Sequence, residues 1–257
     1  MKLYIFGTAS GTEPQPDRKH TAFAVEAGGG LYWFDAGEGC SCTAHNMGLD
    51  LLNVRCIFIS HTHMDHVGGL GNLFWNIRKL TKVRKELPRA DKIRLFIPCL
   101  ATWEGFKTVL ENTEGGFVCD FEMEANPLKS GVIFQNEDIR VTAFPNQHIP
   151  YALEASPLSY SYKIEGEGKT IVFSGDIRRL DELEPCLFGG VDALLTETGH
   201  HKVRDVCLWA KDKEIGKLFF LHHGREILAD STACLLTARE ILGQKADILC
   251  DAQEIQL

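Results

Sequence analysis

Three histidines and one aspartate lie within the six residues His61-Thr62-His63-Met64-Asp65-His66. They follow an apolar run, Cys56 to Ser60, of the kind that forms a strand buried on both faces. Side chains two residues apart can leave such a strand in the same direction, so His61 and His63 can bind one metal ion. The aspartate and the last histidine follow a turn of the chain and can face a second ion. Imidazole and carboxylate ligands suit zinc, iron or manganese.

The alternative for this segment is a histidine-rich surface loop, which explains neither its density of ligands nor its position after a buried strand. A site for two metals needs more ligands than the segment supplies. His148, Asp176 and His222 each come just after an apolar run that predicts a strand, where a loop can bring them to a common rim. Each one alone is more typical of a turn residue or a cap. Together with the first segment they make seven ligands for two metals.

Several longer segments carry a recognisable pattern that covers nearly the whole chain: Phe6 to Thr12 with Arg18, Phe34 to Gly39, Ile57 to His66, Phe173 to Asp176, and Phe220 to His222. In these segments the chain resembles the metallo-β-lactamase superfamily, and within it the ribonuclease Z-like branch. The resemblance implies an α/β fold, a four-layer αββα sandwich with the metals at one edge. It implies His61, His63 and His148 on one metal, Asp65, His66 and His222 on the other, and Asp176 as the bridge.

Two further acidic residues are expected behind these ligands. The resemblance implies that Asp35 lies near the metal site, where it would orient a metal-bound histidine. The alternative for Asp35 is a turn residue before Gly37. Glu197 resembles the acidic residue that opens the family's penultimate segment.

The resemblance implies hydrolysis by a hydroxide bound between two divalent ions, with Asp65 in the catalytic group. Two such ions carry about +4, which leaves roughly one positive charge after the aspartates and the hydroxide, and this suits an anionic phosphodiester. His200 and His201 compete for the role of general acid or phosphate contact. The alternative is that both cap a helix that starts near Val203. His223 is expected at the surface or in the pocket.

Apolar patterning predicts the elements that must position these residues. The predicted strands are 3–6, 22–26, 31–34, 56–60, 94–97, 139–144, 158–164, 170–174, 217–221 and 246–250, and the predicted helices are 69–85, 101–110, 203–213 and 230–242. Their alternation favours a layered α/β architecture with the helices outside. No linker or repeat interrupts the pattern, so we expect one hydrolase domain over residues 1–257.

Composition fits an ordinary soluble globular protein, with 257 residues, 44% hydrophobic and 24% charged. Nine cysteines without a regular spacing indicate free thiols in a reducing compartment, and we expect a cytoplasmic protein with no membrane segment. Cys40 and Cys42 are expected to be core thiols rather than a metal site. The net charge of -8 disfavours general binding of nucleic acid.

The spacing of the motifs favours a small phosphodiester or nucleotide as substrate. Only 28 positions separate His148 from Asp176, and the segment Ile149 to Glu154 is not basic, which leaves no room for a tRNA-gripping arm. A smaller relative, the cyclic-nucleotide phosphodiesterase of phosphonate breakdown, has a similar length and no arm. The alternatives are a ribonuclease Z-like RNA endonuclease and a metal-dependent lactonase or carbon-ester hydrolase. Relatives commonly form dimers, so a homodimer is also among the expectations.

One basic stretch of the sequence could instead bind an RNA substrate. It contains eight cations: Arg78, Lys79, Lys82, Arg84, Lys85, Arg89, Lys92 and Arg94. We expect these residues to form a solvated helix face and loop rather than a binding surface.

Overall fold

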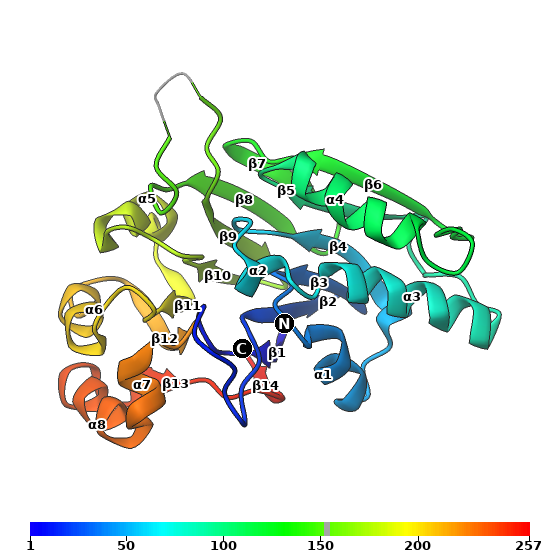
Figure 1. Cartoon of the computed structure of the whole chain (residues 1–257). Coiled ribbons are helices and arrows are strands. Elements are labelled where there is room, and N and C mark those ends of the chain that lie inside the picture. The colour runs from blue at the N-terminus through cyan, green and yellow to red at the C-terminus, as the bar shows by residue number, and fades with distance from the viewer. Residues whose placement is uncertain (152–154) are drawn as a thin grey trace.

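The computed structural model describes residues 1–151 and 155–257. Over these residues, fourteen strands form two seven-stranded sheets that pack face to face, with helices on both outer faces (Figure 1). The predicted four-layer αββα sandwich is therefore confirmed. None of the described helices is long and apolar enough to cross a membrane.

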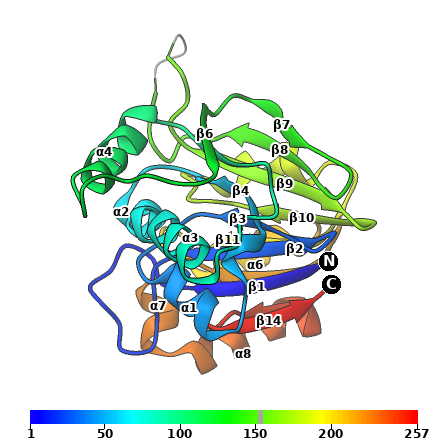
Figure 2. The same cartoon turned by 90° about the vertical axis from the view of Figure 1, so that its right-hand side faces the viewer.

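The first sheet is built from the two ends of the chain and its first half. In spatial order it contains β14 (Gln253–Gln256), β1 (Lys2–Gly7), β2 (Ala22–Ala27), β3 (Gly30–Phe34), β4 (Val54–Phe58), β5 (Lys92–Ile97) and β6 (Glu122–Pro127). The strands from β14 to β3 pair antiparallel, and those from β3 to β6 pair parallel. Because β14 pairs with β1, the two termini lie side by side (Figure 2).

The second sheet comes from the second half of the chain. In spatial order it contains β13 (Ala246–Ile248), β12 (Ile215–Leu221), β11 (Val191–Glu197), β10 (Lys169–Phe173), β9 (Tyr160–Gly166), β8 (Arg140–Pro145) and β7 (Gly131–Gln135). The strands from β10 to β13 are parallel, and β7 to β10 pair antiparallel. As a result β8, β10, β11 and β12 all point their carboxyl ends toward one edge of the sandwich.

Helices cover both outer faces. The first sheet is covered by α1 (Cys40–Asn46), α3 (Leu70–Arg84) and α4 (Leu100–Glu111), which face the viewer's left in Figure 2. The second sheet is covered by α5 (Glu184–Leu187), α6 (Val203–Ala210), α7 (Arg225–Ala229) and α8 (Ser231–Leu242). The short α2 (Met64–Val67) carries part of the histidine motif, and the 3-10 turns are Leu51–Asn53, Leu180–Leu183 and Gly243–Lys245.

Three layers of apolar side chains hold the sandwich together, one between the sheets and one under each helical layer. The layer between the sheets is rich in aromatic rings. Phe23 packs edge-on to Phe173 with ring centroids 5.0 Å apart, and Phe34 packs edge-on to Tyr162 at 5.7 Å. Tyr162 also donates its hydroxyl hydrogen to the backbone oxygen of Ile59, at 2.8 Å. This bond ties the second sheet to the segment that leads into the histidine motif.

Most predicted elements are present with shifted ends, and several are new. β4 starts at Val54 and ends at Phe58, two residues before its predicted end, and α6 ends at Ala210 rather than Lys213. The sequence patterns did not predict β6, β7, β11 or β14, nor the helices α1, α2, α5 and α7.

Candidate metal centre

The residues with metal-ligand chemistry gather where strands of both sheets end. His61 and His63 follow β4, His148 follows β8, Asp176 follows β10, and His222 follows β12. Ligands commonly bind at the carboxyl ends of strands in α/β sheets, because the loops there can turn polar side chains toward one another. The structure brings all seven predicted ligands together at this edge, in two groups.

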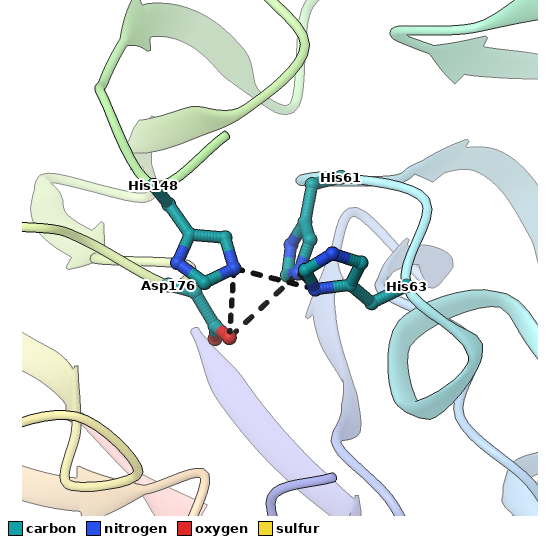
Figure 3. Close-up of side chains that lie close together, drawn as sticks. All are labelled: His61, His63, His148 and Asp176. Carbon is teal, nitrogen blue, oxygen red and sulfur yellow. Dashed lines mark hydrogen bonds and ion pairs between the residues drawn. The ribbon is translucent and has the colours of Figure 1, made fainter. Parts of the chain in front are cut away.

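The first group contains His61, His63, His148 and Asp176, whose ligand atoms lie within 4.8 Å of one another (Figure 3). His61 Nε2 lies 3.0 Å from His63 Nδ1, and His148 Nε2 lies 3.3 Å from the same atom. Asp176 Oδ2 lies 3.7 Å from His61 Nε2 and 3.6 Å from His148 Nε2. Side chains from both sheets thus converge on one point.

The second group contains Asp65, His66, His222 and again Asp176. His66 Nε2 lies 3.3 Å from both Asp65 Oδ2 and Asp176 Oδ1. His222 Nε2 lies 3.1 Å from Asp65 Oδ2 and 3.3 Å from Asp176 Oδ1. Asp176 directs one oxygen to each group, which is the position that a bridging ligand would take.

These two groups fit metal ions on two grounds. Ligand atoms held tetrahedrally at about 2.0–2.1 Å from zinc stand roughly 3.3 Å apart, close to the separations seen here. Among the described residues, the buried atoms His66 Nε2 and Asp176 Oδ1 also lack a hydrogen-bond partner. Buried polar atoms without partners are costly, and a metal ion would provide the partner.

In the second group, the carboxylates and the imidazoles shift one another's pKa values. Burial opposes ionisation of Asp176, but the neighbouring imidazoles of His222 and His66 outweigh it and hold the pKa of Asp176 below its usual range. Burial likewise opposes protonation of His222, but Asp176 and Asp65 raise the pKa of His222 to about 9. The two aspartates are therefore held as anions, the form that binds a metal.

Asp35 lies directly behind the ligands and is fully buried. Its Oδ2 accepts from His66 Nδ1 at 2.6 Å and from the Ser60 hydroxyl at 2.8 Å, and its Oδ1 accepts from Ser60 N at 2.6 Å. Since the Ser60 hydroxyl donates to Asp35, its oxygen is left to accept from His61 Nδ1 at 3.1 Å. One carboxylate thereby orients two imidazoles with their Nε2 atoms toward the metal groups. This contact supports the orienting role over a turn role.

Glu197, at the end of β11, lies behind the other side of the centre and is also buried. Its Oε1 accepts from His200 Nδ1 at 3.0 Å, and its Oε2 accepts from His200 N at 2.8 Å. The hydrogen bond with Glu197 raises the pKa of His200 against the effect of burial. Burial itself opposes ionisation of Glu197, but the hydrogen bond from His200 holds the pKa of Glu197 at about 2.

His200 and His201 both lie near Glu197 but differ in their other surroundings. His200 lines the cavity beside the metal groups, with its Nδ1 3.8 Å from Asp176 Oδ2. His201 Nε2 donates instead to the backbone oxygen of Ile177 at 3.2 Å. Neither caps α6, whose N-cap is Lys202 without a side-chain cap bond. The capping alternative is wrong for both.

The cavity has a volume of about 540 Å³. Four metal-group residues line it, together with residues of the first loop and of the segments near His200 and Arg225: His63, Asp65, Asp176, His222, Ser10, Gly11, Thr12, Gly199, His200, Gly224 and Arg225. A larger cavity of about 650 Å³ lies elsewhere between β5 and β7, and its lining mixes cations and carboxylates without any residue of the two metal groups. Geometry therefore favours the smaller cavity as the place for substrate.

Sequence patterns missed two residues that support the centre. Ser60 links Asp35 to His61, and Gly199 lies against the ring of His222, where a Cβ would come within 2.7 Å of that ring. The motif His61 to His66 could have drawn attention to Ser60, because Ser60 directly precedes it. No local sequence pattern indicates the role of Gly199, because its contact is with His222, which follows a different strand.

Three expectations about other residues were wrong. His223 is neither at the surface nor in the cavity, because it is fully buried and faces Arg18. Cys42 is exposed on α1, so only Cys40 of that pair is a core thiol. Arg78 is not solvated, because it is buried against Trp75 and Phe117 and donates to the Val118 backbone.

Most other cations of that basic stretch have acidic partners, which reduces its suitability for phosphate. The pairs are Lys79 with Glu114, Arg84 with Asp50, Lys92 with Glu122 and Glu124, and Arg94 with Glu124. Residues 152–154, which belong to the segment expected to lack a tRNA arm, lie outside the described part of the chain.

Comparison with known proteins agrees with this geometry. The ribonuclease Z of Methanothermobacter thermautotrophicus is 28% identical over 153 residues, which cover 60% of this chain and 46% of that protein. The chain thus spans about half the length of that relative. Among solved structures, the metallo-β-lactamase fold protein YhfI of Bacillus subtilis superposes with a TM-score of 0.77 at 15% identity, covering 99% of this chain and 98% of that one. A diphosphatase of the PhnP family superposes with a TM-score of 0.68 at 14% identity, covering 100% and 97%.

The predicted membership of the metallo-β-lactamase superfamily, ribonuclease Z-like branch, is confirmed by these relatives and neighbours. The two groups of metal-type side chains give this fold a candidate metal centre. A family model for the anti-Pycsar protein Apyc1 matches residues 1–199, which is most of the chain. The chain therefore belongs to the family of the anti-Pycsar protein Apyc1.

Proposed function

We propose that the protein is a phosphodiesterase that hydrolyses a small phosphodiester or nucleotide in the cavity beside the two metal groups. The observation that carries this proposal is the pair of ligand groups that share Asp176, which lines a cavity of about 540 Å³. A cavity of this size accommodates a molecule of nucleotide dimensions. The similarity to a diphosphatase of the PhnP family supports chemistry on phosphate.

The cofactors in this proposal are two divalent ions, with zinc favoured and manganese or iron as alternatives. His61, His63 and His148 would hold one ion, Asp65, His66 and His222 the other, and Asp176 both. Such ions supply an activated water as nucleophile and a surplus of positive charge that suits an anionic phosphodiester. Nitrogen and carboxylate ligands in four-ligand groups favour zinc.

The protein's own groups orient the reaction and handle its proton. Asp35 fixes His66 directly and His61 through Ser60, so that the site is preformed. Glu197 holds Nδ1 of His200, which leaves Nε2 of that ring to donate a proton to the leaving oxygen. Arg225 also lines the cavity, and its guanidinium is paired with the Glu13 carboxylate at 2.8 Å.

A ribonuclease Z-like RNA endonuclease is the second candidate, because the sequence relatives include ribonucleases Z. Against it stand the short interval between His148 and Asp176 and the acidic partners of the basic stretch. A metal-dependent lactonase or carbon-ester hydrolase is the third candidate, since the same nucleophile can attack a carbonyl carbon. The homodimer expected from the sequence stays a prediction.

Hydrolysis of bis(p-nitrophenyl) phosphate by protein loaded with zinc or manganese tests the proposal, with Asp176→Ala as the matched control. We expect metal-dependent turnover that the control loses. A precursor tRNA and an uncharged lactone are assayed beside it. Faster cleavage of the tRNA would favour the endonuclease, and faster turnover of the lactone would favour the ester hydrolase. Absence of phosphodiester turnover with two ions bound would overturn the proposal.

A further inference from the structure

Three of the proposed metal ligands differ in how their second ring nitrogen is held. His66 Nδ1 donates to Asp35 at 2.6 Å, and His61 Nδ1 bonds Ser60 Oγ at 3.1 Å. For His222 Nδ1, no hydrogen-bond partner exists among the described residues, and Glu197 Oε2 is 3.8 Å away. Metal-binding histidines usually rely on such a bond for their orientation. The orientation of His222 must therefore come from another source.

The backbone at His222 provides the first indication of that source. Its φ of +52° lies in the left-handed region, which is strained for a non-glycine residue and persists only where the surroundings impose it. The surroundings are the first loop of the chain. His223 N donates to Thr8 O at 2.6 Å, and His223 O accepts from Ser10 N at 3.2 Å and from Ser10 Oγ at 2.8 Å. Both ends of residue 223 are thus bonded to that loop.

The side chain of His223 is held as firmly. It is fully buried, with Nε2 2.9 Å from the backbone oxygen of Phe220 and Nδ1 2.7 Å from Arg18 Nη1. A carbonyl only accepts and a guanidinium only donates, so the ring must be neutral with its hydrogen on Nε2. The ring cannot turn over without losing both bonds.

Arg18 connects this ring to the far end of the chain. The same Nη1 donates to Thr8 Oγ1 at 3.0 Å, and Thr8 in turn donates to Asp251 Oδ1 at 2.6 Å. Asp251, in the turn between β13 and β14, also accepts from Lys19 N at 2.5 Å. A continuous set of bonds thus runs from the last turn of the protein to the residue beside His222.

We propose that Arg18 is a positioning residue of the second metal group, which holds His222 in its ligating geometry through His223. This inference rests on the proposed dinuclear function, because it assigns His222 to a metal. His222 Nδ1 has no hydrogen bond to orient its ring among the described residues. Instead, the contacts of Arg18 and of the first loop with His223 fix the backbone next to His222. The ring is then confined by packing, since it lies against Gly199.

The test measures the affinities of both ions in Arg18→Met, which keeps the length of the side chain and removes its donors. Cobalt(II) titrated into metal-free protein, followed by its visible absorption and by calorimetry, resolves the two ions. We expect the dissociation constant of the second ion to rise about 10- to 100-fold, the usual effect of losing an outer partner of a ligand, while the first stays unchanged. Arg18→Lys should recover part of the loss. Arg204→Met, at an exposed arginine of α6, is the matched control.

Two further measurements keep the inference falsifiable where Arg18→Met folds poorly. Thr8→Val removes the hydroxyl that accepts from Arg18 and donates to Asp251, and it should likewise lower the affinity for the second ion. Nitrogen-15 spectra of histidine in the metal-free protein should show His223 as the Nε2–H tautomer in the wild type and lose that signature in Arg18→Met.

The outcomes separate this inference from the proposed function. Equal weakening of both ions, or unchanged affinity for both in Arg18→Met and Thr8→Val, would overturn the positioning role and leave the metal centre standing. A wild-type protein that binds fewer than two ions would overturn the dinuclear centre and this inference with it.

Discussion

Asp35 connects the metal centre to the interior of the protein through a single carboxylate. It accepts three hydrogen bonds, two from Ser60 and one from His66, and it does so at a φ of +54° that favours glycine. A non-glycine residue in this conformation at a functional site indicates that the side chain is needed there. The carboxylate, rather than the turn, accounts for the residue type.

Replacing Asp35 by Asn should therefore weaken metal binding more than its small change in shape suggests. The amide has one oxygen for three donors, so a buried N–H is left without an acceptor, at a cost of about 1–3 kcal/mol in the free energy of unfolding. Affinity for the ion on His66 should fall about 10- to 100-fold. Metal titration and urea unfolding measure the two effects, with Asp212→Asn at an exposed position as control. Wild-type affinity in Asp35→Asn would contradict the orienting role.

His200 and His201 differ by one position in sequence and by their surroundings in the fold. Because His200 lines the cavity and His201 bonds the backbone of Ile177, we expect His200→Ala to lower kcat by about 10²- to 10⁴-fold, the usual contribution of a general acid. His201→Ala serves as the matched control and should retain most of kcat. Metal content should be unchanged in both, as measured by elemental analysis. A larger loss in His201→Ala would reverse the assignment.

At the scale of elements, the sequence predicts those site residues that directly follow an apolar strand. It does not predict residues whose role depends on a contact between separate strands. The motif from His61 to His66 and the strand-end positions of His148, Asp176 and His222 depend on local pattern, and the structure brings them together. β11 was missed because Asp192 and Thr196 interrupt its apolar run, although it lies in the middle of its sheet. β6 and β7 form sheet edges with mixed exposure, so they lack a clear alternation.

The contact between the ends of β11 and β12 leads to a prediction about Gly199. A Cβ on this residue would lie 2.7 Å from the ring of His222, closer than real contacts allow, so Gly199→Ala should displace the ring and weaken the second ion. Gly105, inside α4, has nothing within 4 Å of such a Cβ and is the matched control. Gly105→Ala should leave metal binding unchanged and gain about 1 kcal/mol of stability from helix propensity. If Gly199→Ala binds both ions like the wild type, the packing argument for His222 fails.

At the scale of the whole molecule, the candidate centre lies across the junction of the two sheets. The segment after β4 of the first sheet, made of a loop and α2, supplies His61, His63, Asp65 and His66. Loops of the second sheet supply His148, Asp176 and His222. Each ligand group contains members from both sheets. Bound ions would therefore connect the two halves of the sandwich as well as serve the reaction.

This arrangement predicts a strong dependence of stability on metal. An ion that binds the folded chain and not the unfolded one stabilises it by about 2.7 kcal/mol when its free concentration is 100 times its dissociation constant. Zinc added to metal-free protein should raise Tm, and a chelator should reverse the rise. Asp176→Ala removes a ligand from both groups at once, so zinc should raise the Tm of this variant least. His63→Ala alters one group only, so its Tm should still show part of the zinc-induced rise. An equal zinc-induced rise in Tm in the wild type and in Asp176→Ala would place the stabilising ion outside this centre, and the sheets would then be held by their apolar layer alone.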